Sequence, residues 1–397
     1  MTDNKQVVIT GLGMVTPLGD NNTGIANALA TGKSGLQWLK VPPSDTRTPG
    51  LFAGALGPRE DDPQAPHPTV QECVGTFAMN AARAAMDDSG LDYHRFPRDR
   101  AACVVGTSKG VLVEYAHFFH MNLRRARRGD PYDFTTIGAA FPMTRWPSFN
   151  PNRAAINVAD ALALRGPCLS PVAACATGLA SLARGAQLIT DGHADIVFAG
   201  SSEASTVNSW VRHTFNRLGV LAKNFTDPTK AVRPFADDRD GFLVGEGAAV
   251  MVLESRAAAE ARGARIRATW LGSASGADPT GLTQIDESGE TLAPVIRNCL
   301  TTSNLKPDDI DLLNLHGTAT IPNDRCEANA VAAVFGSRLI QRRAYKSQIG
   351  HCLGAASSIE VGLSLLEPGW NRQLKTALGF GGHLFAAALG RDESRTA

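Results

Sequence analysis

The sequence predicts an α/β fold made of two related halves. Strand patterns and helix patterns alternate along the chain, first up to about residue 255 and then a second time towards the end. The predicted strands are apolar runs closed by small residues, which is typical of strands buried on both faces. Hydrophobic residues make up 43% of the 397 residues, enough for a large core.

The first half covers residues 1–255 and begins with a β-branched run, VVITGLGMVT at residues 7–16, that predicts a buried strand. Helical periodicity over residues 69–89 predicts a helix that ends at Gly90. The further predicted elements are a strand at 101–106, an extended segment at 166–174, a helix from Cys175 to residue 189, strands at 195–199 and 249–254, and a helix at 255–263.

The second half covers residues 256–397 and repeats the alternation. Its first segment, ARIRATWLGSASG from residue 264, is similar in character to the opening strand, which suggests a duplicated unit. The elements that follow are a helix at 291–303, a strand at 310–315, a helix at 324–334, a helix at 355–366 and a final strand near Ala386.

Two segments do not fit the alternation. Pro and Gly cluster at residues 41–68, which are predicted to form a long loop. Residues 113–151 are aromatic, basic and irregular, and are predicted to form an insertion over the surface.

Composition excludes several classes of protein. The formal net charge is +1, so no overall field favours nucleic acid or a membrane as partner. The first residues lack the features of a signal peptide, and no apolar run reaches the ~20 residues of a membrane span. Seven cysteines, an odd number without CxxC pairs, fit neither a disulfide framework nor a zinc site. We therefore expect a soluble, cytoplasmic protein with reduced thiols.

Cys175 lies where an apolar segment meets a helix. In PVAACATG, residues 171–178, small residues flank the thiol and the predicted helix starts immediately after it. A helix N-terminus favours a thiolate by about 0.3–2 kcal/mol, so we expect the pKa of Cys175 to be lowered. The alternative is a buried structural cysteine, the common state of free thiols. We interpret the other six cysteines as structural: Cys73, Cys103, Cys168, Cys299, Cys326 and Cys352.

Two histidines follow predicted strands or turns in loops of small residues. His316 stands in LNLHGTAT and His351 in KSQIGHCLGAA. One such histidine is more often a core or capping residue, but two indicate a site where backbone approaches a ligand. A zinc site of Cys175 and the two histidines is a weaker alternative, because the ligands are not closely paired and no carboxylate partner is evident. No function is predicted for three histidines that stand among polar or aromatic residues: His94, His117 and His193.

Five motifs occur in a fixed order. They are CATG at 175–178, RPF…DRDGFLVGEGA from 233, HGTAT…ND..E from 316, K...GH.LGAA from 346, and GFGG at 379–382. In this order they resemble the elongating 3-oxoacyl-(acyl-carrier-protein) synthases, the beta-ketoacyl synthases of the thiolase superfamily. The resemblance extends from residue 9 to residue 382 and implies the thiolase-like, five-layered αβαβα fold.

The resemblance also implies a role for each matching position. Cys175 would accept the acyl chain as a thioester, and His316 and His351 would bind the malonyl thioester and stabilise the enolate formed by its decarboxylation. Lys346 would face Glu327 as an ion pair. Phe380 would act as a gate, and its N–H would join that of Cys175 in the oxyanion hole. The positions that would contact the substrate are Thr318, Thr320, Gly381 and Gly382.

Three features depart from the family pattern. Ala173 occupies a position that is usually Thr, and His383 and Leu384 follow GFGG where Thr-Asn is usual. Only 28 positions separate His351 from Gly379, and the usual Pro-Pro-Thr-x-Asn run is absent. We therefore expect a shortened, specialised member, with a remodelled substrate entrance or dimer surface.

The partners implied by the resemblance are an acyl carrier protein (ACP), acyl and malonyl thioesters, and a second subunit. No cofactor or metal is expected beyond the phosphopantetheine arm that the ACP carries. A homodimer is implied, with a heterodimer containing a chain-length-factor-like subunit as the alternative. Because the carrier is acidic, a cluster of four arginines is interpreted either as the docking site of the carrier or as a solvated charge run. That cluster is Arg124, Arg125, Arg127 and Arg128.

The implied reaction is a decarboxylative Claisen condensation of an acyl group with malonyl-ACP, in fatty-acid-like or polyketide biosynthesis. A cysteine-dependent acyltransferase that passes the acyl group to an alcohol or amine stays open because of the altered GFGGHL loop and the deletion. The third possibility is a non-catalytic partner subunit. The intact Cys175, His316, His351 and Lys346 argue against it.

Overall fold

The structure, a computed structural model, describes residues 6–40, 51–57, 70–109, 127–129, 150, 152–206 and 209–391. The strands are β1 (Val7–Val15), β2 (Leu36–Lys40), β3 (Leu51–Ala55), β4 (Ala101–Gly106), β5 (Cys168–Leu169), β6 (Ile196–Glu203), β7 (Gly247–Ser255), β8 (Ala268–Ala277), β9 (Leu312–Asn314), β10 (Gln341–Arg343), β11 (Arg372–Gly379) and β12 (His383–Gly390). The helices are α1 (Asn22–Ala30), α2 (Val70–Ser89), α5 (Arg153–Leu162), α6 (Thr177–Thr190), α7 (Ser209–Arg217), α8 (Arg256–Ala261), α9 (Leu292–Thr302), α10 (Ile321–Phe335), α11 (Lys346–Ile349) and α12 (Ala356–Leu366).

The two halves of the chain have the same strand order. One ten-stranded sheet runs β10-β9-β11-β12-β8-β1-β7-β6-β4-β5, and β1 and β8 are its central pair. Outward from this pair, the first half runs β1-β7-β6-β4-β5 and the second half runs β8-β12-β11-β9-β10. If the five strands that each half contributes to this sheet are numbered in chain order, both halves read 1-5-4-2-3. Within the sheet the two sides are joined by the antiparallel pairing of residues 7–9 with residues 268–270. The boundary predicted between residues 255 and 256 falls where β7 ends and α8 begins.

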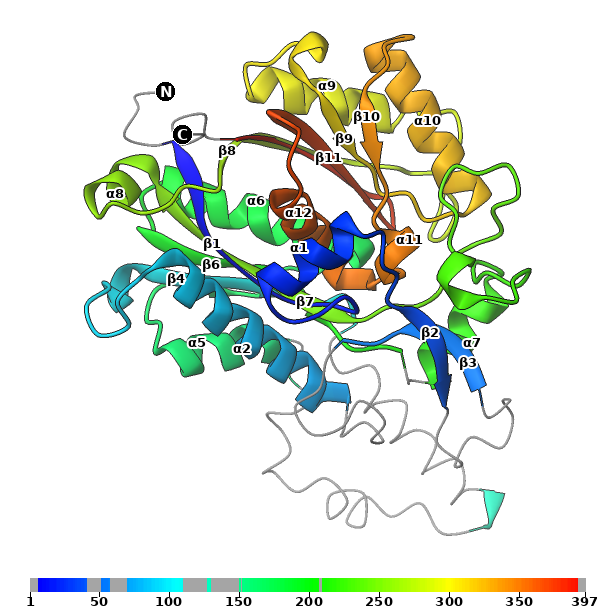
Figure 1. The fold of residues 1–397 in the computed structure, drawn as a ribbon, viewed down its shortest axis with the longest axis horizontal. Helices are drawn as coiled ribbons and strands as arrows, with labels where there is room; N and C mark the ends of the chain where they lie inside the picture. The colour runs from blue at the N-terminus through cyan, green and yellow to red at the C-terminus, as the bar shows by residue number, and fades with distance from the viewer. Residues whose placement is uncertain are drawn as a thin grey trace.

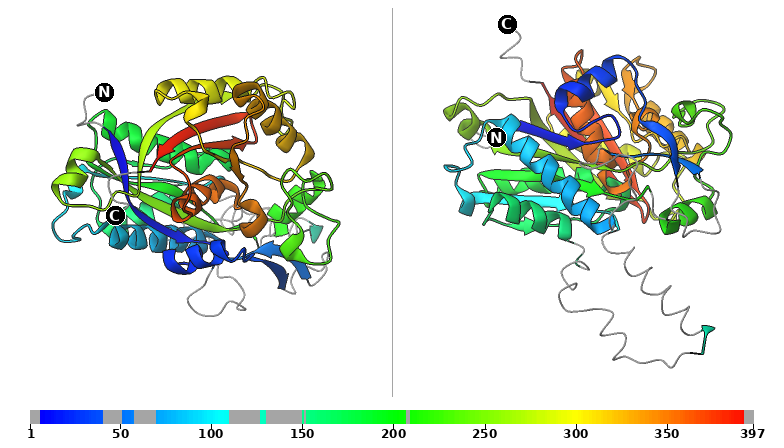
Figure 2. Two further views of the ribbon diagram at one scale, coloured as in Figure 1. Left: turned by 45° about the horizontal axis from the view of Figure 1, so that its top comes forward. Right: turned by 60° about the horizontal axis from the view of Figure 1, so that its bottom comes forward.

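The elements form five layers (Figure 1). Helices α2 and α5 cover the outer face of the first half of the sheet, and α9 and α10 cover the outer face of the second half. Helices α6 and α12 pack against each other between the two halves, as the further views also show (Figure 2). The predicted αβαβα arrangement is therefore confirmed.

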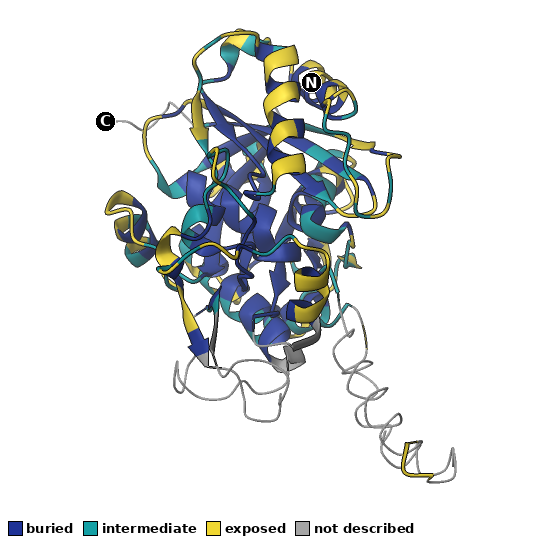
Figure 3. Cartoon of the chain, turned by 90° about the vertical axis from the view of Figure 1, so that its right-hand side faces the viewer, coloured by how far each residue is buried: buried dark blue, intermediate teal, exposed yellow. Residues whose placement is uncertain are grey.

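The central layer is the most deeply buried part of the described chain (Figure 3). Every residue of α12 from Ala356 to Leu365 is buried, including four polar ones. Small side chains let the central helices approach closely: a Cβ on Gly178 of α6 would lie 2.5 Å from the backbone nitrogen of Ser358 in α12. Cys175 lies in the 3₁₀ turn Ala174–Ala176 that leads into α6, so this tight packing fixes the position of the candidate nucleophile.

Most long elements were predicted correctly, because their periodicity is strong. The strand at 7–16, the helix at 69–89, the strand at 101–106 and the helix after Cys175 agree with the structure within about two residues. The loop predicted at 41–68 is wrong for residues 51–55, which form β3 and pair with β2 in a separate two-stranded sheet. Residues 56 and 57 lie in no strand or helix, as predicted. The other residues of that loop and nearly all of the predicted insertion at 113–151 lie outside the described residues.

The shortened connection between α12 and β11 is anchored by one buried residue, Trp370. Residues 367–371 join the two elements directly. The buried Trp370 donates from Nε1 to the Ser364 carbonyl (2.8 Å), and the Arg391 guanidinium lies 4.5 Å from its ring centroid. The short link therefore returns the chain to β11, which carries GFGG back to the centre of the molecule.

Candidate active site

Cys175 lies at a strained turn immediately before α6. Ala174 has a left-handed backbone (φ 47°), which is costly for a residue with a side chain and is typical of functional sites. The Thr177 hydroxyl accepts from the Ala173 N–H (2.9 Å) and donates to the Ala174 carbonyl (2.7 Å), so it braces the turn from inside the helix. The predicted position at the start of a helix is confirmed.

The expected lowering of the Cys175 pKa is wrong. Burial raises the pKa of this thiol to about 11, and the positive charges of Lys109 and then Lys346 only partly oppose the rise. A helix terminus contributes about 0.3–2 kcal/mol, which does not offset the desolvation of a thiolate inside a pocket. In the free protein Cys175 is therefore a thiol at neutral pH.

This pKa predicts how Cys175 reacts with iodoacetamide. Its alkylation rate should rise about tenfold per pH unit from pH 7 to pH 10, because the reactive thiolate fraction grows until the pH reaches the pKa. Peptide mapping by mass spectrometry resolves Cys175 from Cys168, whose pKa is lowered to about 7 by a hydrogen bond with Cys103. A Cys175 rate that levels off near pH 8 would show that the thiol is acidified after all.

His316 follows β9 and is held by Lys346. The Lys346 ammonium lies 3.2 Å from Nδ1 of the ring and also donates to the His316 carbonyl (2.5 Å). Because an ammonium only donates, Nδ1 must accept, and the neutral ring carries its proton on Nε2. Burial lowers the pKa of His316 well below its ordinary value, and the charge of Lys346 lowers it further. His316 is therefore neutral at physiological pH.

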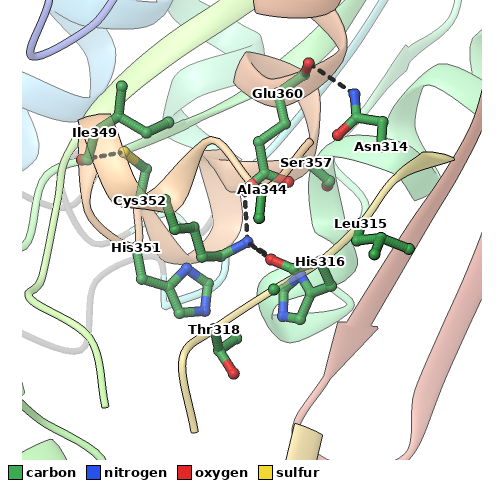
Figure 4. Close-up of polar contacts among 12 residues, drawn as sticks. Asn314, Leu315, His316, Thr318, Ala344, Ile349, His351, Cys352, Ser357 and Glu360 are labelled. Carbon is green, nitrogen blue, oxygen red and sulfur yellow. Dashed lines mark hydrogen bonds and ion pairs between the residues drawn. The ribbon is translucent and has the colours of Figure 1, made fainter. Parts of the chain in front are cut away.

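The His351 ring is also neutral with its proton on Nε2, and here a backbone N–H occupies Nδ1. The N–H of Leu353, a residue with left-handed backbone (φ 49°), donates to Nδ1 of His351 (3.2 Å). Burial is again the main cause that lowers the pKa of His351 well below its ordinary value. The two rings lie side by side, with centroids 5.3 Å apart and planes at 81° (Figure 4). The site thus holds two neutral histidines, each with a proton on Nε2.

The motif DRDGFLVGEGA forms the support of His351. The His351 N–H donates to the Leu243 carbonyl (2.8 Å), and the Gly245 N–H donates to the His351 carbonyl (2.9 Å). The Phe242 ring packs edge-on against the imidazole, with centroids 4.8 Å apart. These contacts fix the ring in one orientation, which explains what the motif does for the site.

The predicted ion pair between Lys346 and Glu327 is wrong. Lys346 pairs with Glu360 of α12 (2.5 Å), and both side chains are fully buried. Glu327 of α10 instead accepts from the backbone N–H groups of His316 (2.8 Å) and Gly317 (2.7 Å). It also accepts from Asn323 Nδ2 (3.1 Å) and Thr376 Oγ1 (2.6 Å). Glu327 therefore anchors the His316 loop and does not contact Lys346.

A pocket of about 110 Å³ brings most of the predicted residues together. Among the residues that line it are Cys175, His316, His351, Thr318, Thr320, Phe380 and Gly382. The Thr318 and Thr320 hydroxyls lie 2.7 Å apart and form a hydrogen bond. Gly381 does not line the pocket; its N–H donates to the Leu282 carbonyl (2.8 Å).

Phe380 stands at the open side of this pocket. It is 36% exposed, and its ring lies 6.4 Å from that of Phe215. A Cβ on Gly379, the preceding residue, would lie 3.2 Å from the backbone nitrogen of Cys175. The backbone at 379–380 therefore borders the nucleophile, where a shared oxyanion hole requires it to be.

Several residues of the site were not predicted from the sequence. Glu360 and Lys375 form a buried ion pair (2.6 Å) next to Lys346. Asp324 accepts from the Thr318 N–H (3.1 Å). The signal that could have found Glu360 is an acidic residue in a helix that is otherwise small and apolar, ASSIEVGLSLL.

The predicted carrier-docking cluster is only partly described. Arg127 and Arg128 are exposed, whereas Arg124 and Arg125 lie outside the described residues. Of the departures from the family pattern, His383 opens β12 at the end of the GFGG turn, and Ala173 is buried behind the nucleophile.

Two features are absent from the described part of the chain. No helix there is long and apolar enough to cross a membrane. In the same residues, no group of three or more His, Cys, Asp or Glu side chains is arranged to hold a metal ion.

Comparison with known proteins adds to this geometry. The sequence matches the family models "Beta-ketoacyl synthase, N-terminal domain" over residues 4–259 and "Beta-ketoacyl synthase, C-terminal domain" over residues 267–367. It is 31% identical over 379 residues to 3-oxoacyl-(acyl-carrier-protein) synthase 2 of Coxiella burnetii, a match that covers 92% of this chain and 86% of that protein.

Solved structures are similar over nearly the whole chain. One is a type II PKS acyl-carrier protein in complex with its ketosynthase bound to the hexaketide (TM-score 0.84, 25% identity). Another is the ishigamide ketosynthase/chain length factor (TM-score 0.84, 27% identity). Each match covers 98% of this chain and 100% of the compared chain.

Proposed function

Because the chain belongs to the beta-ketoacyl synthase family, we propose that it is a 3-oxoacyl-ACP synthase that condenses a Cys175-bound acyl group with malonyl-ACP. The observation that carries this proposal is the pair of neutral histidines beside Cys175. Each presents an Nε2 proton while its Nδ1 is already occupied. Two such donors suit a carbonyl oxygen that becomes an enolate.

The first step loads the acyl group on Cys175. The sulfur attacks the acyl thioester of an acyl-ACP, and the bond to the pantetheine sulfur breaks. Neither histidine takes the thiol proton, because neither ring has a free nitrogen lone pair. The proton therefore ends on the departing pantetheine thiol. The backbone N–H groups of Cys175 and Phe380 hold the oxyanion of the tetrahedral intermediate.

The second step forms the new carbon–carbon bond. The carboxylate of malonyl-ACP leaves as carbon dioxide, and its bonding electrons form an enolate whose oxygen accepts from Nε2 of His316 and His351. The enolate carbon attacks the Cys175 thioester. The carbon–sulfur bond then breaks and returns a thiolate to Cys175, and the 3-oxoacyl product stays on the carrier.

Partners and location are part of the proposal. The phosphopantetheine arm arrives with the ACP, so the chain itself needs no cofactor, and the exposed Arg127 and Arg128 are candidates for contact with the acidic carrier. The two-residue edge strand β5 leaves sheet hydrogen bonds available to a second subunit, and a homodimer is the proposed assembly. We propose a cytoplasmic location, where thiols stay reduced, because the described residues contain no disulfide.

Intact-protein mass spectrometry tests the function. The protein is mixed with a panel of acyl-ACPs and then with malonyl-ACP. We expect an acyl adduct on Cys175 that persists in buffer and disappears when malonyl-ACP is added. An adduct that malonyl-ACP leaves in place, but that an alcohol or amine removes, would identify an acyltransferase instead.

A further inference from the structure

A second buried lysine shares Glu360 with Lys346. Lys346 Nζ lies 2.5 Å from Oε1 of Glu360, and Lys375 Nζ lies 2.6 Å from Oε2. All three side chains are fully buried. Two cations on one carboxylate leave an excess positive charge, which is costly inside a protein unless something balances it.

Lys375 also touches the segment that carries His316. It lies on β11, opposite Asn314 of the neighbouring strand β9, and its Nζ donates to the carbonyl of Leu315 (3.3 Å). Leu315 directly precedes His316. Lys375 is therefore linked to His316 by two sets of contacts. One is its hydrogen bond to the Leu315 carbonyl, and the other is the ion-pair chain through Glu360 and Lys346.

The carboxylate that balances the excess charge is Glu327. It binds Thr376, the residue after Lys375, and successive residues of a strand face opposite sides, so Glu327 and Lys375 lie on opposite faces of β11. Burial raises the pKa of Glu327. The hydrogen bonds that it accepts from two backbone N–H groups, an amide and a hydroxyl oppose that rise, because all four groups donate and so favour the ionised form.

Two other buried carboxylates have their own cations. Asp324 lies 3.3 Å from Arg239, and Glu203 lies 3.8 Å from Lys109. The charged groups that these contacts link to His316 and Leu315 are two lysines and two glutamates: Lys346, Lys375, Glu327 and Glu360. Their charges sum to zero only if Lys375 is charged.

We propose that Lys375 is a positioning residue: its buried ammonium balances Glu327 and Glu360 and thereby keeps His316 neutral, with Nε2–H directed at the substrate. This inference rests on the proposed function, in which a neutral His316 stabilises the enolate. Without Lys375 the cluster would carry a net negative charge beside the imidazole, and a negative charge favours the imidazolium.

The ionisable groups that face Lys375 agree with this account. They are Glu360 on α12, Lys346 on α11 and Glu327 on α10. Burial lowers the pKa of Lys375 from its ordinary value, and the charge of Glu360 opposes that change. The charge of Lys375 is in turn one of the causes that lower the pKa of His316 and His351, while it has no resolved effect on Cys175.

The test is a titration of the His316 ring in the full-length protein by NMR with ¹⁵N-labelled histidine, assigned by the loss of its signals in His316→Asn. In Lys375→Met, which keeps the length and removes the charge, we expect His316 to become protonated about one pH unit higher than in the wild type. Lys375→Gln is the second variant if Met does not fold. The acid limb of malonyl-ACP decarboxylation should move up by the same amount, with acyl loading of Cys175 unchanged within about twofold.

Gln373→Met is the matched control. Gln373 is fully buried, uncharged and two residues before Lys375 on the same face of β11, so its replacement should leave the His316 titration in place. Unchanged titration in both Lys375 variants, or an equal shift in Gln373→Met, would overturn the inference. If the wild type does not decarboxylate malonyl-ACP but the titration shifts as expected, the proposed function fails and the charge-balancing role stands.

Discussion

Replacing Cys175 with alanine should abolish acyl loading and condensation while malonyl-ACP decarboxylation continues within about tenfold. The acyl adduct needs the sulfur, because no other described side chain that lines the pocket is a thiol. Decarboxylation depends on the two Nε2 donors, and the groups that hold these rings at Nδ1 are Lys346 and Leu353, not Cys175. Intact mass of the protein and release of labelled carbon dioxide measure the two activities separately.

Cys168→Ala is the matched control for that variant. Cys168 has the more acidic thiol, with a pKa lowered to about 7, but it lies on the edge strand β5 and not in the pocket. It should load and condense like the wild type. An acyl adduct that survives in Cys175→Ala but disappears in Cys168→Ala would move the nucleophile to the other cysteine.

Replacing either His316 or His351 with alanine should lower decarboxylation by about 100- to 1000-fold, the usual cost of one lost donor to a developing oxyanion. Acyl loading should change by no more than several-fold, because neither ring has a lone pair available to activate the thiol. Rates of carbon dioxide release and of adduct formation separate the two effects. The double variant should lose less than the product of the two factors, because both donors serve one oxygen.

His383→Ala controls for a general effect of removing a histidine near the GFGG turn. His383 does not line the pocket and should retain decarboxylation within several-fold. If loading falls as steeply as decarboxylation in the His316 and His351 variants, the histidines activate Cys175 and the tautomers inferred above are wrong.

The sequence predicted the layers of the fold well, because most of its elements are long and periodic. β1 and β4 are continuous apolar runs, and α2 has a clear helical pattern that ends at a glycine. β3 was missed because its residues, LFAGA, form a strand only by pairing with β2, which no local pattern predicts. The three-residue β10 was missed for the same reason.

The site was predictable as a set of residues but not as a set of contacts. The motifs indicated Cys175, His316 and His351 correctly as pocket residues. They gave no information on which carboxylate meets Lys346, since Glu360 and Glu327 lie on helices on opposite sides of β11. That choice depends on the three-dimensional arrangement of α10, α11 and α12.

The pKa of Cys175 shows the same limit. The helix terminus supplies one local favourable effect, which taken alone predicts a lowered pKa for Cys175. The pocket that desolvates the thiol is formed by residues distant in the sequence, among them Phe215, Phe242 and Leu378, and their combined effect is larger. Only the folded arrangement gives the sign of the shift.

A single-turnover reaction tests the central claim most directly. Acyl-Cys175 protein, freed of excess acyl-ACP, is mixed with malonyl-ACP labelled with ¹³C at the free carboxylate, and carbon dioxide and carrier-bound product are both counted. The account predicts one labelled carbon dioxide and one 3-oxoacyl-ACP for each acyl group lost from Cys175. Loss of the acyl group without labelled carbon dioxide, or carbon dioxide release without a new carbon–carbon bond, would contradict it.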